Sequence, residues 1–117
     1  MAAAIARYIL GDTVAVSSAG VETYPGMRAA RNAMLVMQER GLDISSHRTR
    51  DVRELDVTDF EQIIALDCGV AEKFQRIAAV NQERLTVLNI ADPSGYGLGV
   101  YRERASEIEA ELRRLWL

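Results

Sequence analysis

Cysteine and histidine each occur once in this chain, and each scarcity excludes a class of site. Cys68 alone cannot form an internal disulfide or a multi-cysteine metal site. His47 alone cannot supply a histidine-based metal cluster, so neither a metal nor another cofactor is expected. No apolar run is long enough to span a bilayer, and the first ten residues lack the basic region of a signal peptide. The sequence therefore predicts a cytoplasmic protein.

The charge is mildly acidic and gives no support for a polyanionic partner. The 117 residues carry 14 Lys and Arg against 17 Asp and Glu, which gives a formal net charge of −3. We therefore expect no binding to nucleic acid and none to a membrane surface. The hydrophobic fraction of 49% is ordinary for a globular protein, and the length predicts a single domain over residues 1–117.

Helical and strand patterns alternate along the chain. Apolar residues at helical spacing predict helices over 1–10, 27–40, 70–78 and 101–115. Short apolar runs, several of them rich in β-branched residues, predict strands over 13–17, 62–67 and 85–90. This order predicts an α/β fold, a three-layer α/β/α arrangement with a parallel sheet covered by helices on both faces.

Particular residues are expected to mark the core and the turns of this fold. Gly41 is placed to end the second helix as its C′ residue, and Pro25-Gly26 after Tyr24 predicts a turn. The apolar stripes of the first two helices are expected to comprise Met1, Ile5, Tyr8 and Ile9, then Met27, Ala30, Met34 and Met37.

The loops after the expected strands are the places to look for chemistry, because ligands bind beyond the carboxyl ends of parallel strands. Asp92-Pro93 follows the last expected strand, and a carboxylate there can act as a general acid or base. On position alone we favour a simple turn, because Asp-Pro commonly opens turns. Ser17, Ser18 and Gly20 could present hydroxyl and amide groups to a ligand, but they lack the glycine pattern of a Walker-type phosphate loop.

Two further residues have a functional and a structural interpretation. Cys68 follows an expected strand and could be a nucleophile. We favour a small buried hydrophobic residue instead, because residues 69–74 after it include no arginine and few glycines. His47 lies beside Arg48 and Arg50 and could orient a loop or bind an anion, while a solvated or capping role is at least as plausible.

The motifs taken in order resemble the low-molecular-weight protein tyrosine phosphatase family, whose fold is shared by thioredoxin-coupled arsenate reductases. The resemblance rests on MAAAIARY, VSSAG, Tyr24 and Gly26, SHRTRD, IIALD and ADPSGYG before an amphipathic C-terminal helix. Each motif is modest, but their order and spacing together cover essentially the whole chain.

The resemblance implies a four-stranded parallel sheet in the order 2-1-3-4 and a C-x5-R phosphate loop between the first strand and the first helix. In the family, that cysteine attacks phosphorus, the arginine and backbone amides hold the phosphate, and an aspartate protonates the leaving group. Asp92 matches this general acid, and Tyr24, Ser18 and Tyr96 are the expected substrate-side residues. Ser94-Gly95 replaces the family's usual aromatic after Asp-Pro, and Val70 stands where an asparagine is common.

No residue of this sequence matches the family's nucleophile or its phosphate-binding arginine. Met1 resembles a methionine that follows the phosphate loop, so we expect the first strand and that loop to precede residue 1. Met1 would then be either an internal methionine of a longer reading frame or the start of a shortened protein. Without the strand, neighbouring strand edges would be unpaired, so we expect a homodimer or a strand-exchanged oligomer.

The leading hypothesis is a phosphatase-family domain that is inactive by itself and acts on a phosphorylated protein in any complete form. The alternative is a non-enzymatic pseudophosphatase that serves as a binding or regulatory module. An arsenate reductase ranks last, because it needs redox cysteines beyond Cys68. The surviving Asp92 favours the first hypothesis weakly, since a binding module does not need an acid.

Overall fold

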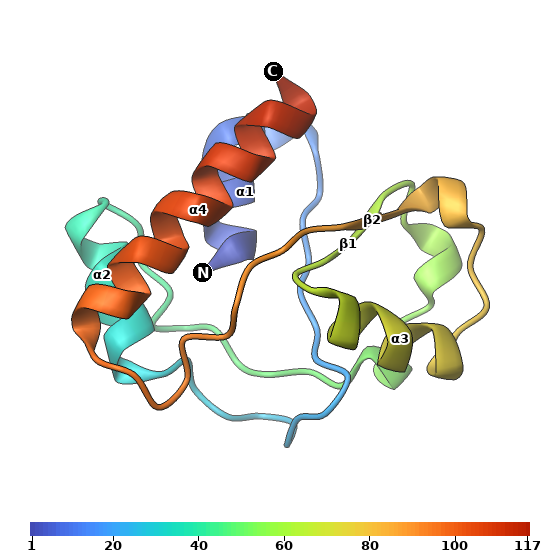
Figure 1. Cartoon of the computed structure of the whole chain (residues 1–117), viewed down its shortest axis with the longest axis horizontal. Coiled ribbons are helices and arrows are strands. Elements are labelled where there is room, and N and C mark those ends of the chain that lie inside the picture. Colours follow the sequence, from blue (N-terminus) through green and yellow to red (C-terminus); the bar gives the residue numbers. More distant parts are fainter.

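The computed structural model describes residues 1–117 as four α-helices and a two-stranded sheet, joined by short 3-10 turns (Figure 1). The helices are α1 (Ala2–Leu10), α2 (Arg31–Glu39), α3 (Cys68–Ile77) and α4 (Leu98–Trp116). The strands are β1 (Ile63–Ala65) and β2 (Leu85–Val87). The 3-10 turns are η1 (Gly11–Thr13), η2 (Val52–Glu54), η3 (Val57–Asp59) and η4 (Gln82–Arg84).

The sheet is parallel, as expected. Ile63 is opposite Leu85 and Ala65 is opposite Val87. Two main-chain hydrogen bonds continue the pairing beyond the strands: Leu88 N donates to Ala65 O and Ile90 N donates to Leu66 O, each at 2.8 Å. The connection between the strands contains α3, which is the usual way to join parallel neighbours. The carboxyl ends of both strands therefore lie at the same edge.

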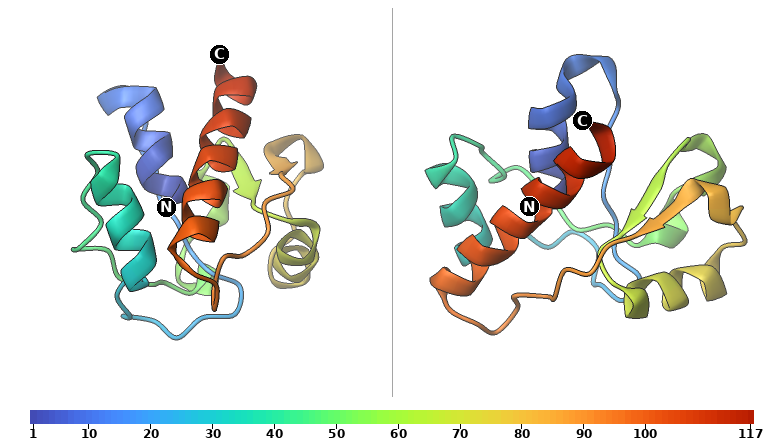
Figure 2. Two further views of the ribbon diagram at one scale, coloured as in Figure 1. Left: turned by 60° about the vertical axis from the view of Figure 1, so that its left-hand side comes forward. Right: turned by 45° about the horizontal axis from the view of Figure 1, so that its top comes forward.

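The main core lies among the helices rather than on the sheet. Helix α4 contacts both α1 and α2; it passes in front of them in Figure 1 and lies beside them in the left view of Figure 2. Eleven buried residues form this core: Ile5, Ala6, Ala33, Val36, Met37, Leu88, Ile90, Tyr101, Ala105, Ile108 and Leu112. The i, i+4, i+7 and i+11 spacing of the α4 members is the apolar stripe expected from the sequence.

A second, smaller group of buried residues lies between α3 and β1. Ala65, Ala71 and Phe74 are buried but do not belong to the main core. Only 14 of 117 residues are buried in total, and none of them is polar. The apolar interior is therefore small and divided into two parts.

The strand expected over 13–17 is absent, and this prediction was wrong. Thr13 ends a 3-10 turn, and Val14 is extended, with φ −122° and ψ 128°. No ladder forms on either side of 14–17. One carbonyl of this stretch, that of Val16, accepts a hydrogen bond from Arg7 Nη2 at 2.8 Å instead. The β-favouring side chains produce an extended conformation, but a strand also requires a hydrogen-bonded neighbour.

Helix α2 begins at Arg31, four residues later than the sequence predicted. Met27 is bound by its main chain to Thr49, since its N–H donates to Thr49 Oγ1 and its carbonyl accepts from Thr49 N. These bonds hold the segment outside the helix and leave the Met27 side chain 55% exposed. Tyr8 was also assigned wrongly to the core face of its helix, because it is 66% exposed while Ala6 is buried.

The end of α2 is as predicted. Gly41 has φ +76°, its N–H donates to Gln38 O, and the N–H of Leu42 donates to Met37 O. This pair of bonds is the Schellman arrangement, in which a left-handed glycine satisfies the last carbonyls of a helix. Gly26 likewise has a positive φ of 82° in the expected Pro25-Gly26 turn.

Candidate functional site

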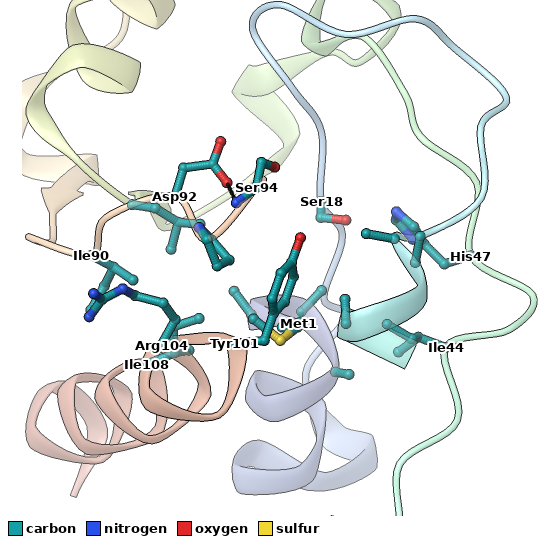
Figure 3. A pocket seen from close by; sticks show the side chains of 18 of the residues that line it. Met1, Ser18, Ile44, His47, Ile90, Asp92, Ser94, Tyr101, Arg104 and Ile108 are labelled. Atoms are coloured by element: carbon teal, nitrogen blue, oxygen red, sulfur yellow. Dashed lines mark hydrogen bonds between the residues drawn. The ribbon is translucent and has the colours of Figure 1, made fainter. Parts of the chain in front are cut away.

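A cavity of about 640 Å³ opens where the loops after the strands meet the amino end of α1 (Figure 3). Its wall includes Ser18 from the extended segment, Asp67 after β1 and Asp92 after β2. Met1 at the start of α1 and Tyr101 on α4 complete it, and the Tyr101 hydroxyl points toward the centre of the view. The three loops singled out in the sequence therefore converge on one site, as predicted.

Asp92 is exposed at the rim of this cavity. Its Oδ1 accepts a hydrogen bond from Ser94 N at 2.9 Å, which is the Asx-type turn expected for Asp-Pro. The turn and the chemical interpretation are compatible, because Oδ1 orients the carboxyl group while no hydrogen bond engages Oδ2. Oδ2 is thus free to contact a ligand in the cavity.

The two tyrosines predicted to line the substrate side lie outside the cavity wall. Tyr24 is 80% exposed and Tyr96 is 64% exposed. Their main chains are anchored, since Tyr24 O accepts from Thr49 Oγ1 at 2.5 Å and Tyr96 O accepts from Asn32 Nδ2 at 3.4 Å. Both side chains are free to contact a large ligand, and their roles remain predictions.

Ser18 lines this cavity and also a smaller, polar cavity of about 210 Å³. Thr49 and Arg50 line the smaller cavity as well. Gly20 closes this smaller space. A methyl group at Gly20 would lie 2.9 Å from Thr23 Cγ2, so the close approach requires glycine. Ser18 is the one predicted substrate-side residue that the structure places in the cavity.

Cys68 is exposed and is not part of the cavity wall. The expectation of a buried hydrophobic residue was therefore wrong. The preceding Asp67 caps α3, because its Oδ1 accepts from Val70 N at 2.8 Å, and Cys68 begins the helix on the solvent side. Phe74 occupies the position that an arginine would need for a C-x5-R motif starting at Cys68.

His47 is half-buried at the junction of the two cavities. Burial lowers the pKa of the His47 imidazole, and nearby positive charges lower it further: the Met1 amino group, Arg50, Arg7 and Arg48. The pKa of the Met1 amino group is itself lowered, by burial and by Arg7. The cavity therefore has a cationic side, which suits an anionic or electron-rich ligand.

Sequence reasoning missed Arg104 and the placement of Tyr101 at the cavity. Arg104 Nη1 pairs with Glu107 Oε1 at 2.5 Å, while Arg104 Nε is buried without a hydrogen-bond partner. Tyr101, Arg104 and Ile108 follow at helical spacing on one face of α4. A cation within an otherwise apolar face was the signal that could have identified Arg104.

The described residues hold no cluster of three or more His, Cys, Asp or Glu side chains suited to bind a metal ion. No helix combines the length and the apolar character needed to cross a membrane.

Comparison with known proteins agrees with this geometry. Residues 1–116 match the family described as low molecular weight phosphotyrosine protein phosphatase, and the chain belongs to that family. It is 28% identical over 116 residues to the glutaredoxin arsenate reductase of Synechocystis sp., covering 98% of this chain and 84% of that protein. It is 27% identical over 124 residues to the protein-arginine-phosphatase of Geobacillus stearothermophilus, covering 98% and 83%.

A solved structure supports the same fold. The low molecular weight protein tyrosine phosphatase of T. tengcongensis superposes with a TM-score of 0.87 at 25% identity, covering 97% of this chain and 86% of that one. The relatives thus include phosphatases and an arsenate reductase, and the resemblance stated from the sequence motifs is confirmed at the level of the family.

Proposed function

We propose that residues 1–117 form the leaving-group side of a site that hydrolyses phosphomonoesters, with Asp92 as the general acid. The observation that carries the proposal is the position of Asp92 at the rim of a cavity that also contains the amino end of α1. Helix amino ends attract phosphate, and a carboxyl group at the rim can protonate the oxygen that leaves when a phosphorus–oxygen bond breaks.

The nucleophile of such a site is not among these residues. The single cysteine is exposed outside the cavity wall and begins no C-x5-R motif. We therefore infer that residues 1–117 alone do not complete the covalent step of the family, in which a cysteine thiolate attacks phosphorus. We further infer that the full three-layer arrangement includes a strand between 14–17 and β1 that these residues do not provide.

Hydrolysis of p-nitrophenyl phosphate by the purified chain tests the proposal. We expect no turnover above the buffer rate for the chain and for its Cys68→Ser and Asp92→Asn variants. Turnover that survives Cys68→Ser but is lost in Asp92→Asn would overturn our account of the nucleophile. If a polypeptide carrying C-x5-R restores activity, Asp92→Asn should lower kcat by about 10²- to 10⁴-fold, the usual contribution of a general acid.

A second candidate is a pseudophosphatase that binds without catalysis. The cationic side of the cavity favours this candidate, because it can bind an anion. The exposed Cys68 lies outside the cavity wall, and binding, unlike catalysis, requires no nucleophile there. Titration calorimetry with phosphotyrosine separates the candidates. A dissociation constant of about 1 mM or lower for the chain alone supports the binding module. An arsenate reductase would require redox cysteines outside these residues, so it remains third.

Three finer expectations accompany the proposal. The substrate is a phosphorylated protein, and whether it is phosphotyrosine or phosphoarginine is decided by a phosphate loop that these residues do not contain. A cytoplasmic location and a homodimer or strand-exchanged oligomer stay predictions, the latter checked by size-exclusion chromatography with light scattering.

A further inference from the structure

Four exposed arginines lie on two neighbouring segments, residues 23–32 and 44–50, whose sequences contain no acidic residue. We call these four residues the arginine strip: Arg28, Arg31, Arg48 and Arg50. None of them forms an ion pair, whereas every arginine of α4 pairs with a glutamate. The positive charge of the strip is therefore without a carboxylate partner.

Main-chain hydrogen bonds hold the two segments side by side at the lower edge of the molecule in Figure 1. Gly26 N donates to Thr49 O and Thr49 N donates to Met27 O, each at 2.8 Å. Beside these bonds, Arg28 and Arg48 oppose each other in an antiparallel bridge. Opposed residues direct their side chains to the same face, and like charges in this position are destabilising. An anion that contacts both guanidinium groups would relieve the repulsion between them.

The acidic residues that border the two segments are engaged elsewhere. Asp43 accepts a hydrogen bond from the main-chain N–H two residues later, at 2.8 Å. Asp51 pairs with Arg53 at 3.0 Å, and Glu22 pairs with Lys73 of α3 at 3.0 Å. The fold itself therefore supplies no carboxylate to the arginine strip.

Exposed apolar side chains lie beside the strip. Tyr24, Met27 and Tyr96 are each more than half exposed. Their main chains are anchored there, since Tyr24 O accepts from Thr49 Oγ1 and Tyr96 O accepts from Asn32 Nδ2. A bound polypeptide can pack apolar side chains on these residues while its carboxylates reach the guanidinium groups, which bind carboxylates in a bidentate manner.

An acidic stretch limits how far an anionic ligand can extend from the strip. Residues 51–61 directly follow Arg50, and they carry five Asp or Glu and one Arg, most of them exposed. A nucleic acid has closely and regularly spaced charges, so a long polyanion would continue from the strip onto this repulsive surface. The formal net charge of −3 also opposes it. A short acidic segment of a protein can contact the strip alone.

We propose that the arginine strip binds a short acidic segment of another protein. Its carboxylates contact Arg28 and Arg48, and its apolar side chains pack on Tyr24 and Tyr96. Because Arg28 also lines the larger cavity, the bound segment passes the rim of that cavity. The proposal concerns binding alone and stands independently of the proposed hydrolytic function.

The test measures the fluorescence anisotropy of two peptides titrated with the full chain. The acidic peptide is Gly-Glu-Leu-Asp-Glu-Leu-Asp-Gly, the control is Gly-Gln-Leu-Asn-Gln-Leu-Asn-Gly, and both carry the same dye at the amino end. We expect the acidic peptide to bind saturably and at least about tenfold more tightly than the control. Raising the salt concentration from about 50 to about 200 mM should weaken its binding by about threefold or more, because salt screens exposed charges. Equal affinity for the two peptides, or an affinity that salt leaves unchanged, overturns the proposal.

Two double variants that change the net charge equally locate the site. Arg28→Gln with Arg48→Gln removes the opposed pair and should weaken binding of the acidic peptide at least about tenfold. Arg102→Gln with Arg114→Gln removes two arginines of α4, which pair with glutamates, and should weaken binding by less than about twofold. Equal weakening by both double variants overturns the assignment to the strip.

A third double variant keeps the location testable if loss of the opposed pair impairs folding. Arg31→Gln with Arg50→Gln leaves the bridge between the two segments intact and should weaken binding of the acidic peptide by about threefold or more. Circular dichroism checks that each variant is folded. Unchanged affinity in this folded variant overturns a site that extends over all four arginines.

An oligonucleotide of about twelve thymidines separates the two kinds of anionic partner. We expect it to bind more weakly than the acidic peptide at the same salt concentration, because residues 51–61 repel it. Tighter binding of the oligonucleotide that is lost in Arg28→Gln with Arg48→Gln overturns the proposal and identifies a single-stranded nucleic acid as the ligand of the strip.

Discussion

Two glycines with equally open surroundings should respond to alanine in opposite directions. An added Cβ at Gly41 or at Gly99 meets no atom within 4 Å, so sterics outside the backbone contribute to neither. Gly41 has φ +76°, and an L-residue in that conformation costs about 1–2 kcal/mol. Gly99 lies in the first turn of α4, where alanine loses less backbone entropy and should stabilise by about 0.5–1 kcal/mol.

Urea unfolding followed by circular dichroism and Trp116 fluorescence measures the difference. With a urea dependence of about 2 kcal/mol per M, Gly41→Ala should lower the midpoint by about 0.5–1 M, and Gly99→Ala should raise it by about 0.25–0.5 M. The two variants share the same chemistry, so each is the control for the other. A midpoint for Gly41→Ala at or above that of the unmodified chain would refute the assignment of a strained Schellman glycine. A decrease for both would show that the space around them is not open.

Three other perturbations have defined outcomes. Because the pKa of His47 is lowered in the folded chain, the unfolded chain binds more protons. The unfolding free energy should therefore rise as pH increases toward the ordinary imidazole pKa of about 6.5. His47→Gln should reduce this pH dependence, measured by urea titrations at several pH values. Asp67→Ala removes the cap of α3 and should cost about 0.5–2 kcal/mol, whereas an unchanged midpoint would contradict the capping role. Leu112→Ala empties a site only 2% exposed in the helical core and should cost about 2–5 kcal/mol, measured as a loss of midpoint.

The sequence predicted the helices better than the sheet, for a physical reason. A helix satisfies its own main chain, so the apolar stripe from Tyr101 to Leu112 sufficed to predict α4. A strand depends on a neighbour that its own residues do not specify. Residues 13–17 have the composition of a strand and no partner, whereas 62–67 and 85–90 pair with each other and shrink to three residues each.

The candidate site was predicted through the positions of loops and not through side-chain contacts. The rule that ligands bind beyond strand carboxyl ends placed Ser18 and Asp92 at one cavity correctly. It could not show that Tyr24 and Tyr96 would be exposed beyond the wall, because a loop's main-chain anchors are set by distant residues such as Thr49. It also could not show Arg104 Nε buried without an acceptor, since that depends on how α4 meets the loop after β2.

The small interior explains why the site depends on the extended segments that border it. Each wall of the cavity is fixed by its own packing: α1 and α4 by the helical core, and β1 by α3. Val16, Ile64 and Leu66 are partly buried against the helical core, so side-chain contacts and not a main-chain ladder hold the two segments beside the cavity. A strand bound there would fix both segments through the main chain. It would then hold Ser18, Asp67 and Asp92 in one fixed arrangement, so we expect the strand inferred between 14–17 and β1 to set the geometry of the site.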